Sequence, residues 1–310
     1  MQYLKFPLTY RPLLWLVVFL PFALNAQSYD WWYDLHDLDP DNNYWKRMMI
    51  ISPGYLGPNA LPVPETTKGV LVRDHFFAFT ASHHFHFGDP TSDLSGKIYL
   101  PFADGKIAFE LQGVIIEKYN FSDDIRIERR ARVLEGKGTT VGDLYVTTHL
   151  QISRDRKFPD TAFRFSARTT SGGDLKAARF SDHPGFYFDF SFSKPFSLGS
   201  VVSLRPYSML GFHSWQTNYI HTLQNDALLY GAGADLTVGN YTLGGGVSGY
   251  SGYQKIKDRP QILWAQAGYE WKQYVATIDW SGGLRDWEYQ TVRFTMAYKF
   301  SAGNGDNALR

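Results

Sequence analysis

The sequence has 310 residues, with 31 Lys and Arg against 30 Asp and Glu, and it contains no cysteine. The balanced charge gives no reason to expect nucleic acid as a partner, and the lack of Cys excludes disulfides, thiolate metal sites and a thiol nucleophile. Aromatic residues make up 17% of the chain, and the mean hydropathy is -0.29. This composition is too polar for a helical membrane protein and too aromatic for an ordinary soluble enzyme.

A targeting segment is predicted over residues 1–26. Lys5 and Arg11 precede an apolar run from Leu13 to Leu24, and Ala26 follows it. Basic residues, a short apolar run and a small residue in this order are typical of a secretory signal peptide. The run is shorter than the roughly 20 residues that a membrane-spanning helix needs. We therefore expect a cleaved signal peptide, with a retained anchor as the alternative.

Residues 27–67 are predicted to form a separate N-terminal segment. Proline is frequent in its second half, which argues against a strand or a long helix there. Its tryptophans would each remove about 150–250 Å² of aromatic surface from water if they were buried. We expect this segment to pack inside the barrel predicted below, as a plug, or against the periplasmic rim of that barrel. The residues concerned are Trp31, Trp32, Trp45, Pro53, Pro58, Pro62 and Pro64.

From residue 68 onward the chain alternates between apolar and polar residues, which is the pattern of β-strands. In the last run, Phe294, Met296 and Tyr298 share one face, and Arg293 and Lys299 share the other. Comparable runs predict about twelve strands. Their ranges are 68–87, 94–103, 105–118, 142–154, 160–170, 184–193, 199–214, 226–239, 240–253, 260–272, 273–283 and 289–301.

Together these strands predict an all-β fold, a transmembrane antiparallel up-and-down β-barrel over residues 68–301, with a tail at 302–310. A soluble β-sandwich would have shorter strands and would not need aromatic residues on every apolar face. Short predicted turns alternate with longer connections, as they do between the periplasmic and outer ends of such barrels. We therefore expect the protein in the outer membrane of a Gram-negative bacterium.

The final strand supports this expectation through a resemblance. Phe294, Tyr298 and Phe300 are similar to the aromatic alternation that ends bacterial outer-membrane proteins, which implies recognition by the barrel-assembly machinery. The Asn25-Ala26-Gln27 end of the predicted signal peptide resembles that of Bacteroidota-like secreted proteins. The run from Val141 to Val146 resembles the Gly-Asp-Leu strand start of phenol-degradation meta-pathway type barrels. That resemblance implies a channel for small molecules.

The polar strand faces place six cations and six carboxylates toward the lumen. Opposed charges of this kind can orient a polar or zwitterionic solute in a channel. They can also pair with one another and fill a narrow barrel, which is the structural alternative. The leading interpretation is a passive or substrate-selective channel for small polar solutes. The predicted pathway residues are Lys97, Glu110, Asp143, Arg164, Arg168, Asp189, Arg205, Asp235, Glu270, Asp279, Arg293 and Lys299.

A lipid hydrolase or acyltransferase at the cell surface is the third interpretation. Such enzymes use Ser and His, and the candidate pairs are His149 with Ser166 and His213 with Ser214. Neither pair lies in a recognisable motif, and no G-x-S-x-G sequence occurs. We therefore name no catalytic residue and expect a protein that is not an enzyme.

Two clusters are candidate metal sites, and neither gives a complete ligand set. The alternation of Asp37, Asp39, Asp41 and Asn43 is similar to the first ligands of a calcium loop, but Met48 stands where a bidentate Glu is expected. The other cluster lacks a nameable third ligand, and its members are His83, His84 and His86. We expect no metal and no cofactor.

The predicted outer loops are more basic than the rest of the chain. We expect these side chains to contact the phosphates of lipopolysaccharide, with attraction of an anionic solute as the alternative. The residues are Arg126, Arg129, Arg130, Arg132, Lys137, Lys176, Arg179, Lys255, Lys257 and Arg259. The expected partners are thus outer-membrane lipids, the assembly machinery and a small polar solute.

Overall fold

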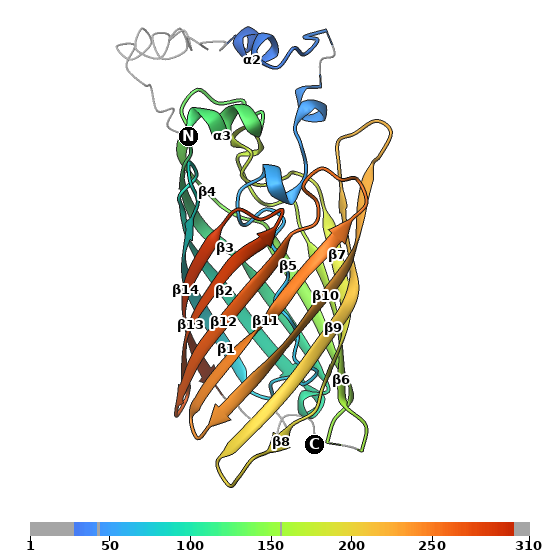
Figure 1. Cartoon of the computed structure of the whole chain (residues 1–310), viewed down its shortest axis with the longest axis vertical. Helices are drawn as coiled ribbons and strands as arrows, with labels where there is room; N and C mark the ends of the chain where they lie inside the picture. The colour runs from blue at the N-terminus through green and yellow to red at the C-terminus, as the bar shows by residue number, and fades with distance from the viewer. Residues whose placement is uncertain (1–27, 42–43, 156, 301–310) are drawn as a thin grey trace, which may run out of the picture.

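The computed structural model describes residues 28–41, 44–155 and 157–300. The expected signal peptide and the expected C-terminal tail lie outside these residues. Twelve antiparallel strands close into a barrel, because β1 pairs with β14 and β9 pairs with β10 (Figure 1). Their bounds are β1 His75–Phe85, β2 Thr91–Phe102, β3 Ile107–Asn120, β5 Leu144–Ser153, β6 Asp160–Arg168, β7 Gly185–Ser193, β9 Val202–Gln216, β10 Gln224–Val238, β11 Tyr241–Gly252, β12 Gln261–Trp271, β13 Tyr274–Arg285 and β14 Gln290–Phe300. The predicted fold class is confirmed.

Two short strands and a few helical turns complete the described residues. β4 (Lys137–Thr140) pairs with β3, and β8 (Phe196–Ser197) pairs with β9. The helices are α2 (Asp30–Leu35) and α3 (Asp123–Glu128), with 3-10 turns at η2 (Trp45–Met48), η3 (Pro53–Tyr55), η4 (Ala103–Gly105) and η5 (Leu175–Ala177). None of the helices in the described part of the chain has the length and apolarity needed to cross a membrane.

The alternation seen in the sequence becomes the two faces of the barrel wall. In β14, Phe294 and Met296 are 50% and 43% exposed on the outside, while Arg293 lies opposite Asp279 of β13 on the inner face. Large apolar side chains exposed in this way recur around the barrel, for example at Phe79 and Ile278. A soluble protein rarely exposes an apolar surface of this extent. Hydrocarbon is therefore the medium that the outer surface fits.

Aromatic side chains gather at one end of this apolar surface. Trp271 stacks with Tyr274 across the turn between β12 and β13, and Tyr241 packs against Tyr269 on the adjacent strands. All four are exposed. Aromatic rings of this kind lie at the membrane–water interface of outer-membrane barrels.

The two ends of the barrel differ in their connections. At the end that also holds the start of β1 and the end of β14, turns such as Gly239–Asn240 and Lys272–Gln273 are short. At the opposite end lie the long connections 121–143 and 169–184. Outer-membrane barrels place short turns in the periplasm, so we call these the periplasmic and outer ends.

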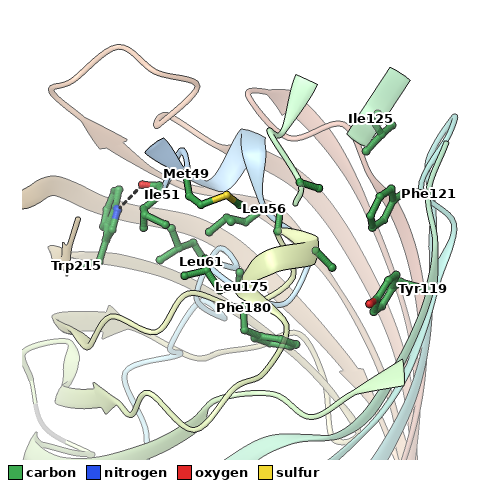
Figure 2. Packing of buried hydrophobic residues seen from close by; sticks show 14 of the residues in the cluster. Met49, Ile51, Leu56, Leu61, Tyr119, Phe121, Ile125, Leu175, Phe180 and Trp215 are labelled. Atoms are coloured by element: carbon green, nitrogen blue, oxygen red, sulfur yellow. Dashed lines mark hydrogen bonds between the residues drawn. The ribbon is translucent and has the colours of Figure 1, made fainter. Parts of the chain in front are cut away.

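The principal hydrophobic core lies inside the outer half of the lumen rather than between layers of sheet. Met49, Ile51, Leu56 and Leu61 of the N-terminal segment, defined from here as residues 28–74, are almost completely buried. They pack against side chains from the outer loops and the inner barrel wall, including Phe180 (Figure 2). Burying this apolar surface fixes the segment inside the barrel.

Candidate functional site: the lumen and its N-terminal segment

The N-terminal segment runs from the outer end, through the lumen, to the periplasmic start of β1 (Figure 1). Near the outer end, Gly54 N donates to Lys257 O at 3.2 Å and Gly57 N donates to Ala178 O at 2.8 Å. The indole of Trp215 on β9 donates to Ile51 O at 3.3 Å (Figure 2). The first part of the segment is therefore tied to the outer loops, and it does not stay at the periplasmic rim.

Deeper in the lumen, wall side chains bind the backbone of the segment. Arg168 of β6 donates to Ala60 O at 2.6 Å, Tyr250 of β11 to Leu61 O at 2.7 Å, and Arg164 of β6 to Glu65 O at 3.0 Å. An extended segment outside the sheet has no ladder partners, so its buried carbonyl groups need such donors. Two of the predicted pathway arginines thus hold the segment in place.

At the periplasmic half the same pattern continues down to β1. The Gln151 side chain of β5 donates to Gly69 O and accepts from Leu71 N, both at 2.8 Å. Lys68 donates to Asp235 of β10 at 2.7 Å. Residues 68–74 therefore belong to the segment, and the first barrel strand begins at His75 instead of at residue 68 as the sequence predicted.

Eleven of the twelve predicted pathway residues lie at inner-face positions of their strands, and Asp143 lies in the connection just before β5. Four of the expected cations pair with expected carboxylates. These pairs are Lys97–Glu110 at 3.9 Å, Arg164–Asp189 at 2.7 Å, Arg168–Asp143 at 3.4 Å and Lys299–Glu270 at 2.6 Å. Two others pair outside the predicted set, Arg205 with Asp160 at 3.2 Å and Asp235 with Lys68. Asp279 and Arg293 form no ion pair among the described residues.

The segment itself brings further polar groups into the lumen, and these were not among the predicted pathway residues. Thr67 donates to Asp189 at 2.6 Å, and Asn59 donates to Asp93 at 3.0 Å and Glu117 at 2.8 Å. Because these contacts join residues far apart in the chain, nothing in the local sequence pattern indicates them.

Above Asn59 a network of buried charges closes the outer mouth, and we call it the outer cap network. Its centre is Asp89, which lies between the guanidinium groups of Arg179 (2.9 Å) and Arg129 (2.6 Å). Arg179 also contacts Glu117 at 2.8 Å. Burial alone would raise the pKa of Asp89, but the neighbouring Arg179 and Arg129 hold it below its usual value. The members are Asn59, His84, Asp89, Asp93, Glu117, Arg129, Arg179 and Tyr289.

This network corrects part of the loop prediction. Arg129, Arg132 and Arg179 were expected to reach lipopolysaccharide phosphates, but they are only 4%, 8% and 0% exposed. The guanidinium of Arg132 lies 3.7 Å from the centre of the Tyr29 ring and also faces Trp32. These arginines therefore hold the outer loops and the segment together, because the loops fold inward over the lumen.

Below the cap, part of the lumen remains exposed to solvent. Glu65 is anchored between β6 and β2, since Arg164 binds its carbonyl and Lys97 lies 3.2 Å from its carboxylate, yet its side chain is 82% exposed. A side chain held inside the barrel can be this exposed only if it faces open lumen. We call this region the vestibule, and its walls carry Thr80, Lys97, Gln266, Thr277, Asp279, Arg293 and Thr295, all only partly buried.

The vestibule ends toward the outer side. On the same wall, Ser82, His84, Ser281 and Thr291 are almost completely buried. His84 is held by Asp93 at 2.7 Å and Thr291 at 2.9 Å. The solvent-exposed region therefore opens toward the periplasm and is closed above by the cap network and residues 49–61.

The alternative metal and catalytic sites are not assembled in this geometry. No group of three or more His, Asp or Glu side chains in the described ranges is placed to hold a metal ion. His149 faces Glu110 at 3.5 Å, whereas Ser166 bonds to Thr147 at 2.7 Å. His213 is enclosed by aromatic rings, and Ser214 follows it on the strand and so points to the opposite face.

The fold defines a class, the outer-membrane β-barrel, and comparison with solved structures agrees. The chain is similar to the COG4313 outer membrane channel from Pseudomonas putida F1, with 11% identity and a TM-score of 0.55 over 77% of this chain and 100% of that chain. The KdgM porin is less similar, with 12% identity and a TM-score of 0.45 over 72% of this chain and 99% of that chain. No protein-family model and no curated protein matches the sequence. The expected resemblance to outer-membrane barrels is thus confirmed at the level of the fold.

Proposed function

We propose that this protein is an outer-membrane channel for small polar solutes, closed in this conformation by its own N-terminal segment. The observation that supports the proposal is the vestibule, which is charged, solvent-exposed and closed on its outer side by residues 49–61 and the cap network. A barrel that served only as a scaffold would have no need of solvated charges such as Arg293 and Asp279, which have no ion-pair partner in the part of the chain that the structure describes. Opening requires that the segment or the outer loops move.

A structural barrel with an ion-paired lumen is the nearest rival. It is favoured by the pairs Arg164–Asp189 and Arg168–Asp143, which are almost completely buried. Those arginines also bind the backbone of the segment at Ala60 and Glu65. These contacts are therefore also expected in a channel whose lumen is closed by a plug that the wall holds in place.

A lipid hydrolase has less support, because His149 and Ser166 are engaged with different partners. Recognition of β14 by the barrel-assembly machinery, and contact of the exposed basic loop residues with lipopolysaccharide, stay predictions.

A reversible lock on the segment tests the proposal. A Cβ atom built on Gly231 of β10 would lie 2.8 Å from Oγ1 and 3.0 Å from Cγ2 of Thr66. These distances match those between the Cβ atom of one half-cystine and the sulfur of the other. The chain contains no other cysteine, so Thr66→Cys with Gly231→Cys gives a single disulfide between the segment and the wall.

We expect planar-bilayer current from the reduced double variant and at least a tenfold lower current after oxidation. Thr66→Cys alone is the matched control and should not respond to reductant. Equal current in both redox states would overturn the closed-plug proposal. The absence of current in the reduced protein, together with the absence of current in a folded barrel lacking residues 28–64, would favour the structural barrel.

A further inference from the structure

Arg293 is the arginine of the vestibule wall. Among the described residues, no carboxylate lies within 4 Å of its guanidinium group. It lies on β14, opposite Asp279 of β13 and Ser82 of β1. Its Nη1 atom makes only a long contact of 3.4 Å with the Ser281 hydroxyl. Its fork of donors is therefore free to bind a ligand.

Two carboxylates flank this guanidinium without pairing with it. Asp279 accepts from the Thr277 hydroxyl at 3.1 Å and forms no ion pair with any residue that the structure describes. Glu65 projects from the segment into the same region, contacted by Lys97 at 3.2 Å but mostly exposed. Asp279 is the register partner of Arg293 on the neighbouring strand, and Glu65 lies beside Lys97 of the same inner wall. Within the described ranges, the wall and the segment thus present one cation without an ion pair beside two incompletely neutralised anions.

This arrangement suits one kind of charge pattern in a ligand. A simple anion would be attracted by Arg293 but repelled by Glu65, Asp279 and the nearby Glu110. A simple cation would meet Arg293 and Lys97. A solute with an ammonium and a carboxylate a few bonds apart can pair with both kinds of charge in this site. The guanidinium can bind its carboxylate through two parallel hydrogen bonds, and the acidic side chains can bind its ammonium group. Hydroxyl groups at Thr80 and Thr295, 2.8 Å apart, add neutral polar partners.

We propose that Arg293, Asp279 and Glu65 form a binding site for small zwitterions of the α-amino-acid type in the vestibule. Arg293 binds the carboxylate, and Asp279 and Glu65 bind the ammonium group. The inference rests on the proposed channel function and names its solute class. Because Glu65 belongs to the N-terminal segment while Arg293 and Asp279 belong to the wall, displacement of the segment removes one side of the ammonium site.

Binding to the full-length protein in detergent tests the site with three probes of similar size. L-Alanine carries both charges, propionate only the carboxylate and ethylamine only the ammonium. In saturation-transfer NMR we expect L-alanine to bind at least tenfold more tightly than either single-charge probe. Arg293→Gln and Asp279→Asn should each remove that preference. Arg285→Gln, at an exposed position at the outer end of β13, should leave it unchanged and is the control.

The outcomes separate this inference from the proposed function. If the reduced lock variant conducts but L-alanine binds no better than propionate, the site is wrong and the channel stands. Equal L-alanine binding by the Arg293→Gln protein, shown to be folded by its heat-modifiable migration, would also overturn the site. Selective L-alanine binding by a barrel that never conducts would support the site and overturn the proposed channel function.

Discussion

Arg179 places Nη1 2.9 Å from both carboxylate oxygens of Asp89, and both side chains are completely buried. Arg179 comes from the loop between β6 and β7, and Asp89 from the turn between β1 and β2. These two connections lie on different sides of the barrel mouth. Their ion pair, extended by Glu117 and Arg129, therefore ties the outer loops together above the lumen.

Removing the charge of Arg179 is expected to weaken this closure strongly. Arg179→Met leaves Glu117 buried with Asn59 as its remaining polar partner. Losing one partner of a buried pair typically lowers the free energy of unfolding by about 3–5 kcal/mol. Lys137→Met breaks an exposed pair with Glu135 and should lower it by less than about 1 kcal/mol. Urea unfolding followed by gel migration measures both, and equal effects would contradict a structural role for the cap.

The course of the segment predicts that residues near the start of the described chain lie at the cell surface. Pro40 and Asp41 are exposed, and α2 lies at the outer end (Figure 1). An epitope inserted between them should be bound by antibody on intact cells. The same epitope after Gly199, in a periplasmic turn, should be bound only after the cells are opened. Surface binding of the second epitope, or none of the first, would reverse the predicted orientation.

The strands were predictable because each one repeats a physical pattern over many residues. In β14 the predicted range 289–301 and the observed Gln290–Phe300 nearly coincide. Successive side chains of a strand face lipid and lumen in turn, so the sequence of a single strand is enough to show the alternation. The inner-face positions of Arg293 and Asp279 followed from it.

The closure of the lumen was not predictable in the same way. Glu65 and Lys97 are separated by 32 residues in sequence and meet only because the segment crosses the barrel. Arg179 was interpreted as a surface residue because basic residues in loops usually face solvent. Its burial depends on Asp89, Thr91 and Glu117, which two other parts of the chain supply. Such contacts produce no periodic pattern in the sequence.

The lipid-facing surface gives a third prediction. Phe294 lies near the middle of β14 and is 50% exposed on the outside of the barrel. Phe294→Lys should lower the free energy of unfolding in lipid vesicles by about 2–4 kcal/mol, the range for Lys at the bilayer midplane. Phe87→Lys, at a fully exposed loop position, is the control and should have little effect. A similar loss in both variants would contradict the proposed membrane span.

The last prediction concerns the response of the closed state to acid. His183, in the loop between β6 and β7, bonds to the side chain of Asn218, which donates to Lys46 O of the N-terminal segment at 2.6 Å. Burial lowers the pKa of His183, and Arg168 and Lys46 act in the same direction, although Asp182 and Asn218 oppose them. The folded loop therefore favours the neutral imidazole.

Because the folded pKa lies below the unfolded value of about 6.5, this contribution to stability is complete at higher pH. It is lost as the pH falls through 6.5 toward the folded pKa. We expect the open probability in planar bilayers to rise at least twofold between pH 7.5 and pH 5.5, as the loop releases the segment at Lys46. His183→Gln keeps a donor for Asn218 but cannot take up a proton, so it should reduce this rise. His221→Gln, at an exposed position between β9 and β10, should respond as the parent does. An unchanged response in the His183→Gln channel would show that another group controls the effect of acid.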